Sequence, residues 1–327
     1  MKFLVTGSSG HLGEALVRTL MDKKHEVIGI DLTPSDFTNK VGSITNRSHV
    51  KKCMKDVNVV LHAATLHKPH IATHSRQEFI DTNITGTLIL LEEALAAGVK
   101  SFVFTSSTTV FGYALMPPAT APAAWITEEV VPIPKNIYGI TKIAAENLCK
   151  LFYRNYNLPC IILRTSRFFP EEDDNREVRE AYDDKNIKTN EFLYRRVDIE
   201  DVVSAHLLAY EKATDIGFAC YIISATTPFT KDDLQELRTN AASVLKRRVP
   251  EYEEEYKFRN WKFFPKIDRV YVNKKAREEL NWHPVYSFKK IIENLKTTDD
   301  IRSPLAKIIG SKGYHDTKFN DGPYPVE

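Results

Sequence analysis

The sequence has few cysteines and arranges none of them in pairs. Cys53, Cys149, Cys160 and Cys220 stand far apart with no CxxC spacing, which argues against a disulfide framework or a zinc cage. An excess of charge is also missing, because 45 Lys and Arg against 43 Asp and Glu leave a formal net charge of +2. Such a chain has no global field to attract nucleic acid or an anionic membrane, and we expect neither as a partner.

Long apolar runs are absent too. No stretch approaches the length of a membrane span, and only Met1 and Lys2 precede the first apolar run, "FLVTG", which predicts no signal peptide. There is no internal repeat or low-complexity segment. We therefore expect a globular protein of the reducing cytoplasm, and 327 residues suffice for a full α/β domain with a smaller appendage.

Short apolar runs recur along the first half of the chain, with helical segments between them. They are apolar at nearly every position and rich in β-branched and aromatic residues, as in strands covered by helices on both faces. The runs are "FLVT" at 3–6, "EVIGI" at 26–30, "NVVLH" at 58–62, "SFVFTS" at 101–106 and "CIILR" at 160–164. This alternation predicts an α/β fold with a Rossmann-type, doubly wound parallel sheet.

The pattern changes after Arg164 and resumes near residue 198. The segment "FFPEEDDNREVREAYDDKN" is charged and poor in aliphatic residues, whereas "IEDVVSAHLLAYEK" and "GFACYIISA" again predict a helix and a strand. We expect the charged segment to form surface elements on the substrate side. The predicted domains therefore interleave: a Rossmann domain of residues 1–164 and 198–225, and a smaller substrate-binding domain of residues 165–197 and 226–327.

The C-terminal part of the chain carries further helix signals. Thr230 is a predicted N-cap with Asp233 three residues later, and "KKAREELNW" and "SFKKIIENL" are typical of amphipathic helices. The end, "SKGYHDTKFNDGPYPVE", is rich in Gly, Pro and Asp and predicts a surface-hugging or loose tail.

A glycine-rich stretch, "TGSSGHLG", follows the first predicted strand and opens the first predicted helix. It places Gly7, Gly10 and Gly13 at the turn where a dinucleotide pyrophosphate would sit. Glycine lets the backbone approach phosphate, and the free N–H groups of the helix stabilise its charge. No Lys followed by Ser or Thr comes after the last glycine, which disfavours a nucleoside-triphosphate site. The alternative is a turn that needs glycine only for tight packing.

Asp31 ends the second predicted strand, where a carboxylate can accept hydrogen bonds from the adenosine ribose. It would repel a 2′-phosphate, and the next five residues, "LTPSD", contain no Arg to receive one. NAD is therefore predicted rather than NADP, and the Rossmann domain becomes the NAD-binding domain. The alternative role of Asp31 is to form a turn.

A Tyr and a Lys four residues apart, in "YGITK" at 138–142, complete an ordered set of motifs. The others are "TGSSGHLG", Asp31, "HAAT" at 62–65, "DTNITGT" around Asn83, "TSSTTVFG" at 105–112, "RRVDIEDV" and "ELNWHP". In this order they resemble the extended short-chain dehydrogenase/reductase superfamily, and within it the NAD-dependent epimerase/dehydratase family, most like UDP-galactose 4-epimerases. The resemblance spans most of the chain.

The resemblance implies that Ser107, Tyr138 and Lys142 are catalytic. A phenol has a pKa near ~10 and is a poor base unless positive charge stabilises the phenolate. Lys142, one helical turn away, could supply that charge and bind the nicotinamide ribose. Tyr138 would then move the proton of a substrate hydroxyl during hydride transfer, and Ser107 would orient the substrate oxygen.

The resemblance also implies the cofactor contacts. In "GSIT", Ser43 stands where the family usually has an acidic residue after the third strand, which predicts a weaker contact to adenine. Besides Tyr138 and Lys142, the predicted contacts are Gly7, Gly10, His11, Leu12, Gly13, Asp31, Ser43, Ile44, Ala63, Ala64, Asn83, Thr105 and Ser106.

The run after Ser107, "STTVFG", contains no acidic residue. Sugar-nucleotide 4,6-dehydratases carry an Asp-Glu pair there and decarboxylases a Glu, so both activities lose support. The run looks most like that of UDP-galactose 4-epimerases, and a nucleotide-sugar 4-epimerase is the first hypothesis. The second is an NAD-dependent dehydrogenase or reductase of a sugar, sugar acid or other secondary alcohol. The third is a catalytically silent NAD-binding redox sensor, which an intact Ser107, Tyr138 and Lys142 disfavour.

On the substrate side, Arg167 stands where nucleotide-sugar enzymes usually carry an Asn, and "FFP" replaces "YGP". The four acidic residues at 171–174 predict either a solvated loop or a negative field that Arg167, Arg176 or Arg179 has to offset. Arg167 could instead clamp a carboxylate or phosphate of a smaller substrate. It is a predicted substrate contact.

Three histidines, His67, His70 and His74, have spacings that would suit a metal if they lay on a helix. Pro69 interrupts the segment, so we predict no metal and take His67 as a substrate contact. Thr108 is a further predicted substrate contact.

Relatives commonly dimerise through the helix after Asn83 and the helix of Tyr138. "LILLEEALAAG" and "AAENLCKLFYRNY" carry the apolar surface for such packing, and we expect a homodimer. The other predicted partner is a small molecule, either a sugar or a sugar nucleotide.

Overall fold

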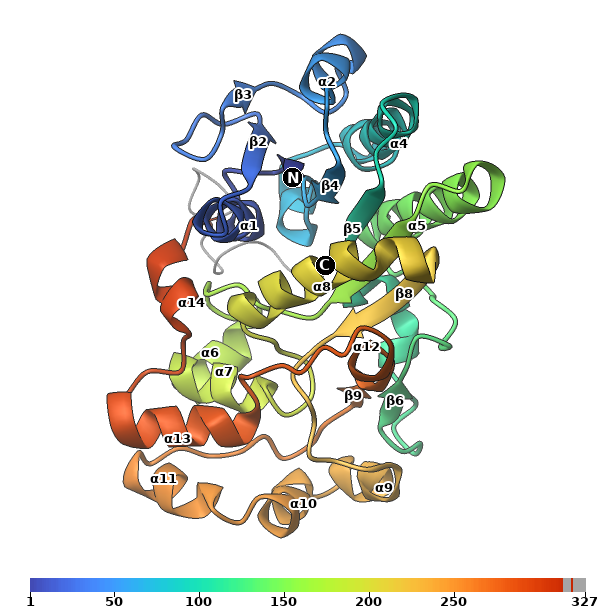
Figure 1. Cartoon of the computed structure of the whole chain (residues 1–327). Coiled ribbons are helices and arrows are strands. Elements are labelled where there is room, and N and C mark those ends of the chain that lie inside the picture. The colour runs from blue at the N-terminus through green and yellow to red at the C-terminus, as the bar shows by residue number, and fades with distance from the viewer. Residues whose placement is uncertain (314–318, 320–327) are drawn as a thin grey trace.

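The main sheet holds seven parallel strands in the order β3-β2-β1-β4-β5-β7-β8 (Figure 1). The computed structural model describes residues 1–313 and residue 319. The strands are β1 (Lys2–Thr6), β2 (Glu26–Asp31), β3 (Lys40–Val41), β4 (Val59–His62), β5 (Ser101–Ser107), β7 (Cys160–Thr165) and β8 (Phe218–Ile223). The order grows outward from β1 in both directions, so the predicted doubly wound α/β fold is confirmed. Sequence periodicity missed β3, which is two residues long.

Helices cover both faces of this sheet. One face carries α1 (His11–Asp22), α8 (Ile199–Ile216), α12 (Lys274–Glu279) and α14 (Pro304–Ile309). The other carries α2 (Arg47–Cys53), α4 (Gly86–Ala96) and α5 (Ile137–Tyr156). Since both faces are covered, the strands are apolar nearly throughout, as in other parallel sheets. The short α3 (Arg76–Phe79) and the π-helix η2 (Ile80–Thr85) lead into α4.

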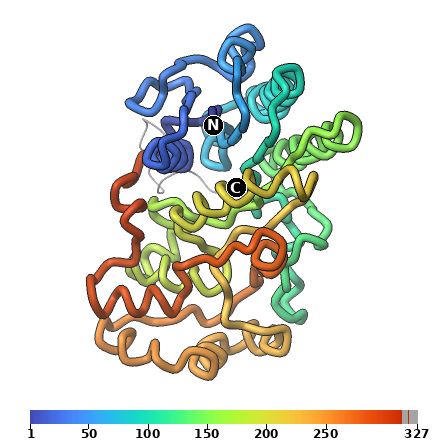
Figure 2. The backbone as a smooth tube through the Cα atoms, in the orientation of Figure 1, coloured from blue at the N-terminus to red at the C-terminus, as the bar shows by residue number. Residues whose placement is uncertain are grey.

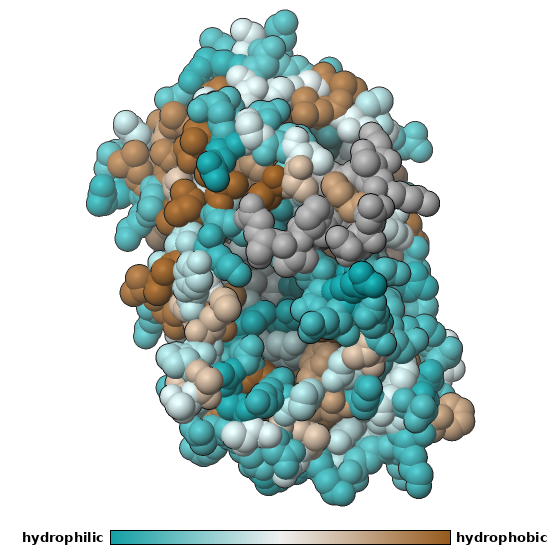
Figure 3. Space-filling view, turned by 180° about the vertical axis from the view of Figure 1, so that it is seen from behind, coloured by the Kyte–Doolittle hydropathy of each residue, from teal (hydrophilic) through white to brown (hydrophobic). Residues whose placement is uncertain are grey.

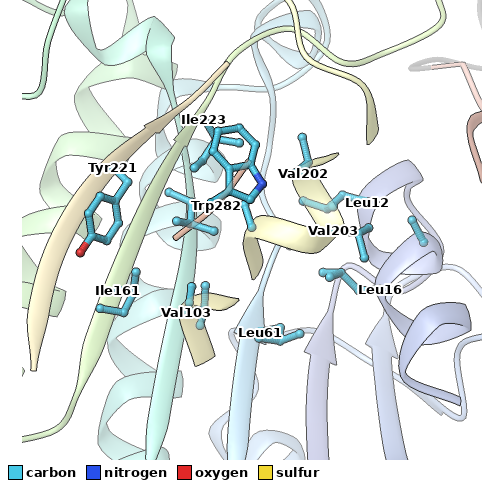
Figure 4. Packing of buried hydrophobic residues seen from close by; sticks show 14 of the residues in the cluster. Leu12, Leu16, Leu61, Val103, Ile161, Val202, Val203, Tyr221, Ile223 and Trp282 are labelled. Atoms are coloured by element: carbon cyan, nitrogen blue, oxygen red, sulfur yellow. The ribbon is translucent and has the colours of Figure 1, made fainter. Parts of the chain in front are cut away.

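The larger core lies between the sheet and the α1 and α8 face. Leu16 of α1 and Val203 of α8 point toward Leu61 and Val103 of the strands, and Trp282 lies near Ile223 at the far side (Figure 4). Trp282 is fully buried, and its indole N–H donates to the Asp201 carbonyl at 3.1 Å. The loop that follows α12 is thereby fixed to α8.

A second hydrophobic core holds the lower part of the molecule together (Figure 1). It unites residues before and after the β8 strand, among them Ile187, Leu193, Leu237 and Ile291. Its elements are β6 (Ala124–Ile126) paired with β9 (Arg269–Tyr271), α6 (Arg176–Ala181), α7 (Asp184–Glu191), α9 (Leu234–Leu237), α10 (Ala241–Arg248), α11 (Tyr252–Phe258) and α13 (Phe288–Thr298). The proposed domain boundaries remain a prediction.

The charged segment at 168–186 lies mostly at the surface, as expected, with only Asp173 and Asn186 buried. The residues that follow it turn inward, and Asn190 and Glu191 are buried as well. Tyr256, for example, donates from its hydroxyl to Asn190 Oδ1 at 2.6 Å. Hydrogen bonds and ion pairs make burial of such polar groups possible.

Short helical turns complete the described chain. The 3₁₀ turns are η1 (Lys68–Ala72), η3 (Thr108–Phe111), η4 (Tyr113–Leu115) and η5 (Lys231–Asp233). At the start of η5 the Thr230 amide donates to Asp233 Oδ2 at 2.8 Å, in line with the predicted helix start. The predicted tail lies mostly outside the described residues, and only its first three residues, 311–313, and residue 319 are described.

The chain path brings distant segments together. In Figure 2 the red end of the described chain, which includes α14, returns beside the dark blue α1. On the face opposite to Figure 1, hydrophilic residues prevail, and apolar ones gather in patches over the upper half (Figure 3). Within the described residues we find no helix that combines the length and the apolar character needed to cross a membrane.

Candidate active site

A cleft of about 1400 Å³ opens at the carboxyl ends of the sheet strands and extends to the small β6-β9 sheet. Open α/β sheets bind ligands at this edge, where loops from neighbouring strands diverge. The cleft is lined by nearly all of the predicted site residues: Gly7, Gly10, His11, Leu12, Gly13, Asp31, Ser43, Ile44, Ala63, Ala64, His67, Thr105, Ser106, Ser107, Thr108, Tyr138, Lys142 and Arg167. The fold thus brings together residues that are up to 160 positions apart.

The glycine-rich stretch forms the turn between β1 and α1, as predicted. Gly7 has φ +74°, and a Cβ there would lie 2.8 Å from the Ala64 amide nitrogen. A Cβ on Gly13 would lie 1.8 Å from the Gly7 carbonyl oxygen. Only glycine fits at both positions, and the resulting turn leaves room for phosphate at the amino end of α1. These residues therefore fit a dinucleotide.

Asp31 is tied to the phosphate loop. Its carboxylate accepts the Ser9 amide N–H and the Thr33 amide N–H, each at 3.0 Å, and its side chain still lines the cleft. Asp31 is thus both a turn-former and a carboxylate available to a ribose. The two alternatives raised by the sequence coexist.

Asn83 differs from the other predicted cofactor contacts because it lies behind the cleft wall, with 3% of its surface exposed. Its Oδ1 accepts from the Leu66 amide at 2.8 Å and the Thr65 hydroxyl at 3.0 Å. Its Nδ2 donates to the Leu66 carbonyl and to Thr141 Oγ1, both at 3.0 Å. Asn83 therefore holds the loop after β4, whose Thr65 and Leu66 line the cleft. It sits in the π-helix η2, a distortion that often marks functional sites.

Ser107, Tyr138 and Lys142 meet in the middle of the cleft. Tyr138 and Lys142 lie one turn apart at the start of α5, where Asn136 caps the helix by accepting the Gly139 amide at 3.1 Å. Lys142 Nζ donates to the Thr105 carbonyl at 2.8 Å and lies 6.0 Å from the Tyr138 ring centroid. Ser107 ends β5 next to Thr105 and hydrogen-bonds with the Tyr138 side chain.

Burial disfavours the charged forms of both Tyr138 and Lys142. Burial raises the pKa of Tyr138 to about 12, which the hydrogen bond with Ser107 partly offsets. Burial lowers the pKa of Lys142 to about 7, with a partial offset from the Glu146 carboxylate. At neutral pH the protein by itself thus keeps Tyr138 a neutral phenol. Formation of the phenolate requires further positive charge beside the ring.

Ser106, Glu146 and Arg164 form a buried polar cluster next to Lys142. Glu146, one turn after Lys142, accepts the Ser106 hydroxyl at 2.6 Å and two Arg164 N–H groups at 3.0 and 2.7 Å. All three side chains are almost completely buried. The i, i+4 spacing of Tyr138, Lys142 and Glu146 could have revealed this residue from the sequence.

His67 stacks on the catalytic candidate Tyr138. The two rings are nearly parallel at 16° with centroids 5.5 Å apart, and Phe169 contacts His67 edge-on at 5.0 Å. Burial lowers the pKa of His67 well below its ordinary value, and His70 and Lys142 lower it further. His67 is therefore a neutral ring that covers Tyr138 in the wall of the cleft.

Arg167 is committed to acidic residues of its own chain. Its Nη1 lies 2.8 Å from Asp173 Oδ2 and 3.5 Å from Glu191 Oε1, and its Nη2 donates to the Glu172 carbonyl at 3.0 Å. Burial lowers the pKa of Arg167, but Glu191 and Asp173 outweigh it and raise the pKa. The acidic run is thus not a solvated loop. Arg167 offsets it, as the second alternative required.

Other basic residues complete this network. Arg195 Nη2 lies 2.7 Å from Glu191 Oε1, and Lys68 Nζ lies 2.6 Å from Asp174 Oδ2. Arg179 donates to the Asp173 carbonyl at 2.6 Å, whereas Arg176 pairs with Glu180 on its own helix. Arg179 therefore also helps to hold the acidic run.

The sequence analysis missed several cleft residues. Arg195, Arg269 and Tyr271 line the substrate end, and Lys312 and Gly313 line the phosphate end. Arg195 lay within the quoted motif "RRVDIEDV", but no local pattern marks Arg269 or Lys312. Residues 1–313 contain no group of three or more His, Cys, Asp or Glu side chains arranged to hold a metal ion.

Comparisons with known proteins agree with this geometry. The family model "NAD dependent epimerase/dehydratase family" matches residues 3–218, more than half of the chain. A UDP-glucose 4-epimerase from Erwinia amylovora is 29% identical over 167 residues, 46% of this chain and 48% of that protein. A 3-beta-hydroxysteroid dehydrogenase from Mycolicibacterium neoaurum is 34% identical over 119 residues, 33% of this chain and 32% of that protein. The chain spans about half the length, or less, of these curated relatives.

A solved structure shares the fold over almost the whole chain. It is a short-chain dehydrogenase/reductase superfamily protein from Agrobacterium tumefaciens with bound NAD, 22% identical, with a TM-score of 0.65 over 94% of this chain and 99% of that one. The predictions of the NAD-dependent epimerase/dehydratase family, of an NAD-dependent enzyme and of NAD as the cofactor are confirmed by the family model. The chain belongs to the NAD-dependent epimerase/dehydratase family.

Proposed function

We propose that this protein transfers hydride between NAD and a secondary alcohol of a sugar-type substrate, and that it acts as a nucleotide-sugar 4-epimerase. The observation that carries the proposal is the cleft itself, which joins the phosphate loop, the Ser107 and Tyr138 hydroxyls and the Arg269 end of the small sheet. A cleft of about 1400 Å³ has room for a second ligand beside a dinucleotide. The similarity to a UDP-glucose 4-epimerase supports the sugar-nucleotide class.

In this proposal each polar group near Tyr138 has one role. NAD, when bound, supplies the acceptor and donor of hydride. Tyr138 takes the proton of the substrate hydroxyl and returns it, Ser107 orients the substrate oxygen, and Lys142 adds positive charge beside the phenol. His67 covers the ring of Tyr138 and contacts the substrate. Thr108 is a second substrate contact.

The competing function is an NAD-dependent dehydrogenase or reductase of a sugar, sugar acid or other secondary alcohol. One observation favours it: Arg167 Nη1 already pairs with Asp173 at 2.8 Å, and Asp173 offsets much of the positive charge that a diphosphate would need. A less charged substrate would leave the ion pair intact. Arg269 on β9 shows no ion pair among the described residues and would then be the anion contact.

The first experiment separates the two functions. Freshly purified protein is denatured, and the released nicotinamide cofactor is quantified together with its redox state. An epimerase holds its reduced cofactor until the keto-sugar is reduced again, so near-stoichiometric NAD or NADH is expected. The protein should then interconvert UDP-glucose and UDP-galactose. A protein that emerges empty, binds added NAD and forms NADH with free sugars or uronic acids would instead support the dehydrogenase.

The second experiment tests the role of Tyr138. Tyr138→Phe is expected to lower turnover about 10²- to 10⁴-fold, because the general acid/base is lost, while NADH binding is kept. Tyr156→Phe is the matched control, since Tyr156 lies on the same helix but is exposed and away from the cleft. Unchanged turnover in Tyr138→Phe would rule out Tyr138 as the general acid/base of either function.

The proposal also covers assembly and compartment. We expect a homodimer formed by α4 and α5, where Ile140, Leu151 and Tyr156 are exposed. The four cysteines are free thiols, three of them buried, which suits a reducing cytoplasm.

A further inference from the structure

The end of the described chain crosses the phosphate loop. Glu171 Oε1 accepts the Ser311 hydroxyl at 2.8 Å, the Gly313 amide at 3.2 Å and the Lys312 amide at 3.3 Å. The same oxygen lies 2.9 Å from Nε2 of His11, at the first turn of α1. One carboxylate thus joins three segments: the phosphate loop, the acidic loop after β7 and the chain end.

Helix α14 fixes the position of residues 311–313. Its Leu305 and Ile309 pack against the core beside α1 and α8. The Ser303 amide, just before the helix, donates to Asp198 Oδ2 at 3.1 Å. Gly310, with φ +62°, then turns the chain toward His11. The position of residues 311–313 is therefore set by packed structure.

The charges at this point need balance. Glu171 is almost fully buried and, although burial alone would raise its pKa, hydrogen bonds from His11 and Ser311 hold that pKa at about 2. A second carboxylate, Glu14, lies in the first turn of α1 and pairs with Arg18 at 2.7 Å and with Lys312 Nζ. Two carboxylates near the amino end of α1 would repel the two negative charges of a pyrophosphate. Arg18 and Lys312 together offset them, so without Lys312 the local charge is one unit more negative.

We propose that Ser311, Lys312 and Gly313, held by Glu171, form a clasp over the cofactor site. Lys312 supplies the counter-charge for the pyrophosphate, and the clasp has to open before the dinucleotide can leave. Lys312 and Gly313 line the same cleft as the phosphate loop, which places the clasp on the exit path. The clasp makes NAD a retained group. This inference rests on the proposed function only in that NAD binds this cleft, and it deepens that function because an epimerase must keep its reduced cofactor.

The test measures cofactor release rather than turnover. NADH is bound to the full chain and displaced by excess NAD, and the loss of NADH fluorescence gives the dissociation rate. Lys312→Ala and a chain ending at Gly310 are expected to release NADH about 10- to 100-fold faster, because charged hydrogen bonds over the site are lost. Lys312→Arg should stay near the wild-type rate. Lys307→Ala is the matched control, since Lys307 is an exposed lysine of α14 outside the cleft.

One further variant and the salt dependence show whether residues 311–313 and the charge of Lys312 cause the slow release of NADH. A chain ending at Gly313 keeps the clasp and should stay much closer to the full chain than the one ending at Gly310. Salt should weaken NADH binding less in Lys312→Ala than in the wild type, because one counter-charge is gone. Thermal unfolding without NADH identifies any variant that fails to fold, and the point variants then decide.

The possible release rates separate the clasp from the proposed function. Faster release in Lys312→Ala and in the shorter chain, with Lys307→Ala unchanged, supports the clasp. Equal release rates in the wild type, Lys312→Ala and the chain ending at Gly310 overturn it and leave NAD binding untouched. Equal losses in the chains ending at Gly310 and Gly313 also overturn it, because residues 311–313 would then contribute nothing. A full chain that binds no NADH contradicts the proposed function itself.

Discussion

Tyr138 and Lys142 lie in the same wall of the cleft, and burial pushes their pKa values apart, to about 12 and about 7. Their charged forms are both disfavoured because water is excluded. A positive nicotinamide ring bound beside Tyr138 would change this balance, since positive charge stabilises a phenolate. We therefore expect the ionisation of Tyr138 to be coupled to the redox state of the cofactor.

This coupling predicts a pH dependence that differs between NAD⁺ and NADH. With NAD⁺ bound, the pKa of Tyr138 should fall below its free value of about 12, so binding releases a proton at pH values between the two pKa values. The affinity for NAD⁺ should therefore rise with pH in that window, by up to about tenfold per pH unit, whereas the affinity for NADH, whose ring is neutral, should change much less. Titration calorimetry at about pH 6 to 9 in buffers of different ionisation enthalpy measures both the affinity and the protons released.

Two variants assign the proton. Tyr138→Phe should abolish most of the extra pH dependence of NAD⁺ binding, because the titrating phenol is gone. Lys142→Met removes the contribution of the lysine to the pH dependence, since its own pKa of about 7 lies in the measured range. An unchanged pH profile in Tyr138→Phe would show that the phenol does not ionise on binding.

At the scale of elements, the π-helix η2 and the loop after β4 form one unit. Asn83 lies in η2, and four hydrogen bonds join its side chain to Thr65, Leu66 and Thr141. Thr141 belongs to α5, between Tyr138 and Lys142. A single buried amide therefore links the cofactor loop to the helix of the catalytic candidates.

Replacing this amide should affect stability and the site together. Asn83→Ala leaves the Leu66 amide and carbonyl without their partner, and we expect it to cost about 2 to 4 kcal/mol in the free energy of unfolding. Cofactor binding should weaken as well, since Thr65 and Leu66 line the cleft. Urea unfolding and NADH titration measure the two effects.

Asp81→Ala provides the comparison on the same turn. Asp81 is exposed and its side chain accepts from Gln77 at 2.8 Å, so its loss should change stability by no more than about 0.5 kcal/mol. Equal stability of Asn83→Ala and Asp81→Ala would contradict the linking role of Asn83.

At the scale of the whole molecule, helix α5 faces two ways. Tyr138, Lys142 and Glu146 are buried toward the cleft and sheet, whereas Ile140 is 50% exposed and Leu151 is 37% exposed. A single apolar residue is common on a protein surface, but these two lie on one of the two helices through which we expect the chain to dimerise. The outward face of α5 is thus the expected centre of the homodimer.

The dimer is tested by changing one residue of this face. We expect light scattering to give twice the chain mass for the wild type, and Leu151→Glu to raise the dissociation constant at least about tenfold by placing a charge in an apolar contact. Phe258→Glu makes the same kind of change on α11, where Phe258 is 82% exposed, and should leave the dimer intact. A monomeric wild type, or equal behaviour of the two variants, would contradict the prediction.

Local patterns in the chain were enough to predict the Rossmann sheet, the phosphate loop and NAD, whereas the candidates Ser107, Tyr138 and Lys142 followed from the resemblance of the ordered motifs to a known family. A buried parallel strand is apolar throughout, a phosphate turn needs glycine, and one helical turn separates Tyr138 from Lys142. Such constraints act over a few residues, and they can therefore be recognised in the order of the chain.

Other features of the site depend on contacts between segments that are distant in the chain. They are the commitment of Arg167 to Asp173, the place of Asn83 behind the wall, the support from Glu146 and Arg164, and the contact of Lys312 with Glu14. The pKa values of Tyr138 and Lys142 likewise depend on burial, which the whole fold creates. The energy of a buried charge is fixed by every group around it, and those groups are brought together only when the chain is folded.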